Sequence, residues 1–170
     1  MSAAAGLPAT TEAVLEILHE VKDPEVPAVD VVDLGIVRGA LVDGDRVTVR
    51  VTPTYSGCPA TQVIEQEIRE ALLRRGFQEV TVETVFNPPW TTDWMTESAR
   101  EALRAYGIAP PGKASAAAEL VTLGGPTRPV ECPYCGSSDT RLESKFGSTA
   151  CKSIHVCHGC RQPFEHFKPF

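Results

Sequence analysis

The residues VVDLGIVRGALVDGDRVTVRVTPT, from Val31 to Thr54, decide the fold of this chain. Two runs of β-branched residues flank the turn Asp43–Asp45, and an Asp-Gly pair in that setting favours the positive φ angles of a tight hairpin. Valines at positions 47, 49 and 51 alternate with polar residues, which predicts one buried and one solvent-facing side for the second strand. The stretch therefore predicts an antiparallel strand pair.

Helical patterns lie on both sides of this hairpin. Apolar residues recur at three- and four-residue steps over 11–22, behind Thr10 and Thr11, and again over 60–75, where Gly76 suits a C-cap. A further strand is predicted over 79–86, and a last helix ends at Gly107. The predicted fold class is α+β, a small sheet with an antiparallel hairpin packed by helices. It is followed at the C-terminus by two Cys-x-x-Cys pairs, at 132–135 and 157–160, which predict a zinc ribbon.

The composition is that of a globular protein in solution. Of the 170 residues, 42% are hydrophobic and 22% charged, which predicts one core with a small appendage. The start of the chain lacks a basic region before its apolar residues, so we expect a cytoplasmic protein with no membrane partner. The formal charge of -6, without any run of Lys and Arg, argues against a nucleic-acid partner.

A change of composition marks the domain boundary. Residues 109–130 are rich in Ala, Pro and Gly and show no sustained period, which is typical of a linker. We therefore predict an α/β domain over 1–108, a linker over 109–130 and a small cysteine-rich domain over 131–170.

Two Cys-x-x-Cys pairs dominate the C-terminal domain. Cys132 and Cys135 form the first pair, and Cys157 and Cys160 form the second. Four thiolates suit a closed tetrahedral zinc site, whose role is structural because no position is left open for water. Disulfides are the competing interpretation, and iron in a rubredoxin-type site is the second choice of metal.

Four further side chains of this domain remain outside the symmetric assignment. Cys151, His155, His158 and His166 are predicted to pack around the site, although Cys151 or His155 could replace a ligand. Sulfur chemistry at Cys151 is the alternative to a small buried residue.

Cys58 stands apart from the other cysteines, where the second strand ends and a helix begins. We expect Pro59 at the first helical position and a thiol whose pKa is lowered by the helix N-terminus, and a buried structural cysteine is the alternative. Asp33, inside an apolar strand, either caps the helix start or shares a site with the thiol. Asp23 and Glu25 are interpreted first as turn residues.

Several motifs in order resemble the MIP-eighteen family, also called domain of unknown function fifty-nine. They are DPEVP at 23–27, VDLGIV at 32–37, TPT at 52–54 with GCP at 57–59, and Pro89-Trp90 through Gly107-Ile108. Members are small α/β proteins associated with iron-sulfur cluster assembly or delivery. The resemblance implies that Cys58 is the functional cysteine and that Asp23, Glu25, Asp33 and Thr54 line its site.

The C-terminal motifs narrow this resemblance. With CPYCG at 132–136, FGSTACK at 146–152 and FEHFK at 164–168, nearly the whole chain is similar to the PaaD-like family of bacterial phenylacetyl-CoA epoxidase subunits. This resemblance implies an accessory protein of phenylacetate catabolism whose partners are the reductase or the diiron oxygenase. Only Glu16 and His19 have the Glu-x-x-His spacing of a bundle-type diiron site, so oxygenase chemistry is expected on another chain.

Three functional hypotheses follow. The first is a non-enzymatic assembly factor, in which Cys58 transiently binds iron or an iron-sulfur cluster and the zinc ribbon docks the partner. The second is a stable structural or electron-transfer subunit with iron in the four-cysteine site. The third is an enzyme with Cys58 as nucleophile, which needs His19 or a ribbon histidine as base. A homodimer is left open.

Overall fold

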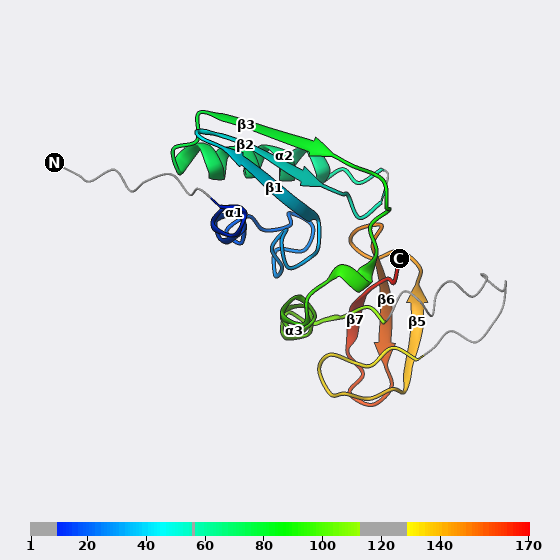
Figure 1. Ribbon diagram of the computed structural model, residues 1–170. Helices are drawn as coiled ribbons and strands as arrows, with labels where there is room; N and C mark the ends of the chain where they lie inside the picture. Colours follow the sequence, from blue (N-terminus) through cyan, green and yellow to red (C-terminus); the bar gives the residue numbers. More distant parts are fainter. Residues whose placement is uncertain (1–9, 56, 113–128) are drawn as a thin grey trace. The chain divides into compact units, whose positions relative to one another are not determined.

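The computed structural model describes residues 10–55, 57–112 and 129–170, which divide into two compact units, residues 1–90 and 91–170 (Figure 1). The α+β class predicted from the sequence is confirmed. Among the helices of these described ranges, none combines the length and the apolar character that crossing a lipid bilayer requires.

A three-stranded sheet with helices forms the first unit. Its elements are α1 (Thr11–Leu18), β1 (Val37–Asp43), β2 (Arg46–Val51), α2 (Thr61–Arg74) and β3 (Glu79–Thr84). The strand order is β1-β2-β3, with β1 antiparallel and β3 parallel to β2. Helix α2 connects the two parallel strands and lies along one face of the sheet (Figure 1).

The predicted alternation in β2 builds the core of this unit. Val47, Val49 and Val51 are at most 2% exposed, whereas the residues between them face outward. Ile64 and Ile68 of α2 are buried as well, as a period of 3.6 residues requires. The apolar face of the sheet and the apolar side of α2 are thus buried against each other.

The hairpin and the first helix follow local sequence signals. Gly44 adopts φ 62°, the conformation expected for a tight Asp-Gly turn between β1 and β2. The Thr10 hydroxyl accepts a hydrogen bond from the Ala13 N–H at 3.2 Å and caps α1. Helix α1 ends at Leu18, earlier than the period over 11–22 predicts.

The prediction that Asp33 lies inside a strand is wrong, because residues 31–36 form turns ahead of β1. The side chain of Asp30 stabilises them, since its Oδ1 accepts hydrogen bonds from the N–H groups of Val32 (3.1 Å) and Asp33 (2.8 Å). Gly35 adopts φ 79° at the end of the turn. A carboxylate that satisfies free N–H groups competes with strand formation.

The second unit contains a four-stranded sheet of order β4-β7-β6-β5. Its elements are the 3₁₀ turn η1 (Thr92–Trp94), α3 (Glu97–Ala105), β4 (Ile108–Ala109), β5 (Thr140–Ser144), β6 (Lys152–Cys157) and β7 (Pro163–Phe167). Strands β5, β6 and β7 form an antiparallel meander, and β4 pairs with β7 in parallel.

The division between the units differs from the predicted boundary at residue 108. Ile108 and Ala109 pair with Glu165 and His166 of β7, so residues 91–109 pack with the C-terminal cysteines. Ala109 also shares a buried cluster with Cys132, Cys157 and Phe164. The extents of the predicted domains stay a prediction, and residues 113–128 of the predicted linker lie outside the described part of the chain.

Gly107 provides a test of this packing. It adopts φ 89°, and a Cβ atom there would lie 2.7 Å from the hydroxyl oxygen of Tyr134, within the first Cys-x-x-Cys turn. We expect Gly107→Ala to lower the free energy of unfolding by about 1–3 kcal/mol, from backbone strain and displacement of Tyr134. Urea unfolding at fixed zinc checks this value. Gly112→Ala is the control, because no heavy atom lies within 4 Å of its Cβ position, and equal stability losses for both variants would contradict the prediction.

Candidate metal centre and cysteine groove

The two Cys-x-x-Cys pairs meet in the second unit. The Sγ atoms of Cys132 and Cys160 are 3.7 Å apart, those of Cys135 and Cys157 are 3.6 Å apart, and all four lie within 4.8 Å of one another. A tetrahedron of sulfurs about 2.3 Å from zinc has edges of about 3.8 Å, so these residues fit a zinc ion. Disulfide bonds, the competing interpretation, need sulfurs about 2.05 Å apart and are excluded for these pairs.

Backbone hydrogen bonds position the thiols. The Gly136 N–H donates to the Cys132 carbonyl at 2.9 Å, and Gly136 adopts φ 73°, which closes the first turn. The Cys160 N–H donates to Cys157 Sγ at 3.5 Å in the second turn. This N–H lowers the pKa of the Cys157 thiol to about 6, so its thiolate is available at neutral pH. Four thiolates leave no open coordination position, so the zinc they bind is structural.

The remaining cysteine and histidines of the unit lie outside this cluster. Cys151 is 2% exposed, and its Sγ lies 3.0 Å from the Thr149 hydroxyl. His158 pairs with Asp139 at the surface. His155 and His166 make an edge-to-face contact on β6 and β7, and burial, together with His155, lowers the pKa of His166 to about 4. None of the four belongs to the four-cysteine cluster, and their packing around the metal stays a prediction.

Cys58 lies in the first unit, in a turn between β2 and α2. Its N–H donates to the Tyr55 carbonyl at 3.2 Å, and its carbonyl accepts from the Thr61 N–H at 3.3 Å. Helix α2 begins at Thr61 with Ala60 as its N-cap, so Pro59 precedes the helix instead of occupying its first position. The turn therefore includes residues that the sequence pattern predicts to lie in the first turn of the helix.

Burial raises the pKa of the Cys58 thiol above its ordinary value. A hydrogen bond from the Ala60 N–H and one from Thr54 lower it in part, while the negative charges of Glu25 and Asp23 raise it further. The predicted lowering by the helix N-terminus is therefore wrong, because desolvation and two carboxylates outweigh the local donors. The thiol is protonated at neutral pH.

Three of the four residues that the resemblance assigns to the cysteine act on it electrostatically: Glu25, Asp23 and Thr54. Asp23 is 5% exposed, and its Oδ1 accepts hydrogen bonds from the N–H groups of Glu25 and Val26, both at 2.8 Å. Asp23 therefore stabilises a turn, as the structural interpretation holds, and also places Glu25 where its charge reaches Cys58.

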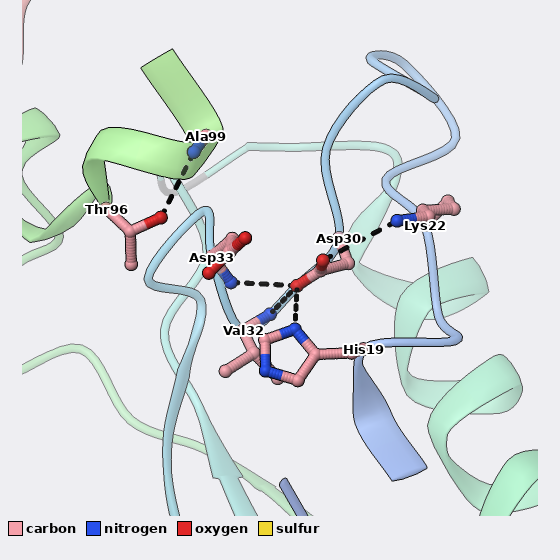
Figure 2. Close-up of polar contacts among 7 residues, drawn as sticks. All are labelled: His19, Lys22, Asp30, Val32, Asp33, Thr96 and Ala99. Atoms are coloured by element: carbon pink, nitrogen blue, oxygen red, sulfur yellow. Dashed lines mark hydrogen bonds and ion pairs between the residues drawn. The ribbon is translucent and has the colours of Figure 1, made fainter. Parts of the chain in front are cut away.

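Asp33 belongs to a different group. Oxygen and nitrogen atoms of His19, Asp30 and Asp33 lie within 4.8 Å of one another, and His19 Nδ1 is 3.1 Å from Asp30 Oδ1 (Figure 2). Lys22 Nζ lies 3.5 Å from the other oxygen of Asp30, so the buried carboxylate already contacts a cation. Asp33 is absent from the groups that shift the pKa of Cys58.

A groove of about 500 Å³ opens beside Cys58. Its lining is formed by Pro53, Tyr55, Gly57, Cys58, Pro59, Thr61, Gln62, Thr84 and Phe86. Phe86 is 61% exposed. No histidine is among the described residues that line the groove.

Tyr55, Thr84 and Phe86 of the groove are not among the residues predicted from the sequence. They lie at or beyond the carboxyl ends of β2 and β3, and parallel strands bring these ends to one edge of a sheet, where α/β proteins bind ligands. The sequence does contain a signal that could have located them. The strand–helix–strand order over 46–84 predicts a parallel pair of strands, whose carboxyl ends lie at the same edge of the sheet.

Comparison with known proteins gives a family match for each part of the chain. Residues 11–85 match the family described as iron-sulfur cluster assembly protein, and residues 116–168 match the PaaD zinc beta ribbon domain. The chain is 47% identical over 152 residues, 89% of its length and 88% of the relative, to an Escherichia coli (strain K12) protein named as a putative subunit of 1,2-phenylacetyl-CoA epoxidase.

The first unit has relatives of its own. The Fe-S protein maturation auxiliary factor YitW of Bacillus subtilis (strain 168) is 38% identical, over 56% of this chain and 94% of the relative. A crystal structure of a domain of unknown function, DUF59, from Bacillus anthracis aligns with TM-score 0.51 and 31% identity, over 55% of this chain and 90% of that one. The chain therefore belongs to the iron-sulfur cluster assembly protein family, in the group with a PaaD zinc ribbon that includes homologues of this epoxidase subunit.

The zinc site gives a direct prediction. We expect about one zinc per chain, and its removal by a chelator should unfold the ribbon, because a unit this small depends on its metal. Elemental analysis and amide hydrogen exchange across β5–β7 check this. Cys151→Ser should retain the zinc, whereas Cys157→Ser should lose it. Full zinc retention in Cys157→Ser would contradict the assignment.

The carboxylates near Cys58 give a second prediction. Replacing Glu25 by Gln removes a negative charge that raises the thiol pKa, so the thiolate fraction at neutral pH should increase. Alkylation of Cys58 by iodoacetamide, followed by peptide mass spectrometry from pH 6 to 10, should be roughly a few-fold faster at pH 7.5. Glu67→Gln on the exposed face of α2 is the matched control. Identical pH profiles for Glu25→Gln and the unmodified chain would contradict this account.

Proposed function

We propose that this protein is an accessory factor for the maturation of an iron-sulfur protein, and that Cys58 is the residue that receives the metal cargo. The observation that supports this proposal is how the cysteines are distributed. Four of them fit a closed zinc site in one unit, whereas Cys58 lies in the other unit beside an open groove. The names of the relatives, an Fe-S protein maturation auxiliary factor and a phenylacetyl-CoA epoxidase subunit, support this function.

The surroundings of Cys58 suit a transient contact with a cation. Glu25 and Asp23 disfavour the thiolate alone, but the positive charge of iron favours both the thiolate and the carboxylates. Within the described residues, Cys58 has no set of His, Cys, Asp or Glu donors within 4.8 Å that would complete a coordination sphere. Further donors must come from outside this set, which is the arrangement that ligand exchange with a partner requires.

We assign the partner to the phenylacetyl-CoA epoxidase system, with the reductase or the diiron oxygenase as the recipient. Similarity to the Escherichia coli epoxidase subunit over most of the chain supports this assignment. The zinc ribbon supplies the second contact surface in this proposal, because its closed metal site has no position for substrate.

The test measures iron and acid-labile sulfide in the partner enzymes after coexpression with variants of this chain. Cys58→Ser should reduce the cluster or metal content of the recipient at least about tenfold, because serine is a poor ligand for iron in such sites. Cys151→Ser is the matched control, since Cys151 is buried outside the zinc cluster. Full metal content of the partner with Cys58→Ser, at normal zinc content of the variant, would refute the proposal.

A further inference from the structure

Strand β3 is an open edge of the sheet in the first unit. It pairs with β2 on one side, and no strand within the described residues pairs with its other side (Figure 1). Its sequence EVTVET contains no Pro or Lys, and its register with β2 is regular from Glu79 to Thr84. Proteins usually protect such an edge with these residues, with a bulge or with a covering segment.

The opposite edge of the same sheet is protected. Strand β1 has an irregular register between Val37 and Gly39, and the Thr11 hydroxyl of α1 donates to the Ala40 carbonyl at 2.8 Å. A bulge and a covering helix are two of the usual devices against edge pairing. Among the described residues of this unit, the contrast between the two edges identifies β3 as the unprotected one.

The hydrogen-bonding groups at the β3 edge follow from its register. The Glu79 N–H donates to the carbonyl of Asp45, the residue before β2, at 3.4 Å. The Val85 N–H, just after β3, donates to the carbonyl of Val51 in β2 at 2.8 Å. Because backbone groups alternate sides along a strand, those of Val80, Val82 and Thr84 point to the open edge. The side chains of these three residues are half-buried on the α2 face.

We propose that a second copy of this chain pairs with β3, antiparallel, about a two-fold axis at Val82. Val82 then lies opposite Val82 of the second copy, and Val80 lies opposite Thr84, so the free N–H and C=O groups of both edges satisfy one another. Half-buried side chains of the two copies meet on the same face. The outward-facing Thr81 lies opposite Glu83, and its hydroxyl can donate to that carboxylate.

Charge selects this register over its neighbour. A two-fold axis at Thr81 also matches the backbone groups, but it places Glu79 directly opposite Glu83 of the second copy. Like charges at directly opposed positions destabilise a sheet. Each glutamate pairs with an arginine of its own copy, Arg46 at 3.2 Å and Arg50 at 3.4 Å, which reduces this repulsion without adding an attraction between the copies.

The pairing also extends the groove beside Cys58. Thr84 lines this groove, and its hydroxyl donates to Glu65 of α2 at 2.6 Å. In the paired arrangement, Val80 of the second copy is the direct neighbour of Thr84, so the second copy adds an apolar residue next to the groove. This inference does not depend on which cargo or partner Cys58 serves.

Sedimentation equilibrium of the full zinc-loaded chain tests the proposal, with expected dimers at about 100 µM. Val82→Pro removes an N–H that faces the edge and makes no bond to β2, so the unit should stay folded while dimerisation weakens at least about tenfold. Thr81→Glu should weaken it by roughly tenfold, because glutamates then oppose each other twice across the axis. Combining Thr81→Glu with Glu83→Lys should restore the dimer.

Leu41→Lys is the control, since Leu41 is a 62% exposed residue of the same sheet on the protected strand β1. It should leave the dimer unchanged. Monomers of the unmodified chain at every concentration would overturn the proposal, as would a dimer that Thr81→Glu and Val82→Pro leave intact. If Val82→Pro loses helical circular dichroism, the charge variants alone decide the result.

Discussion

The burial of the β2 valines beneath α2 is the constraint on which the first unit depends. Because Val47, Val49 and Val51 need an apolar cover, α2 must return across the sheet, and β3 then has to run parallel to β2. That crossover brings the ends of two strands and the start of a helix to one edge. Cys58 lies in the turn that leads into the helix, so the position of the thiol follows from the packing of the core.

Two physically different cysteine environments coexist in this chain. In the ribbon, backbone N–H groups contact the sulfurs of Cys135, Cys157 and Cys160, and the four thiolates share a zinc ion. At Cys58, burial and neighbouring carboxylates oppose ionisation. The first environment favours permanent metal binding, and this binding contributes to the free energy of folding. The second favours a neutral thiol at neutral pH.

Local signals made much of the fold predictable, and nonlocal contacts explain the failures. The Asp43–Asp45 turn, the period of α2 and the Cys-x-x-Cys spacing each depend on neighbours in sequence, and the structure confirms all three. The docking of β4 on β7 joins segments more than fifty residues apart and leaves no local pattern. The turn position of Asp33 and the raised pKa of Cys58 likewise arise from burial and charges that a sequence window does not contain.

The electrostatics of Cys58 bear on release as well as on binding. A thiol with a lowered pKa would already be a thiolate at neutral pH, so no proton uptake would accompany departure of a bound cation. Here the empty site favours a protonated thiol, so proton uptake can accompany departure of the cation and lowers the cost of returning to the free state. Glu25 and Asp23 contribute to both directions, since their charges attract the incoming cation and disfavour the bare thiolate left behind. Under the proposed function, this balance suits a carrier better than a storage site.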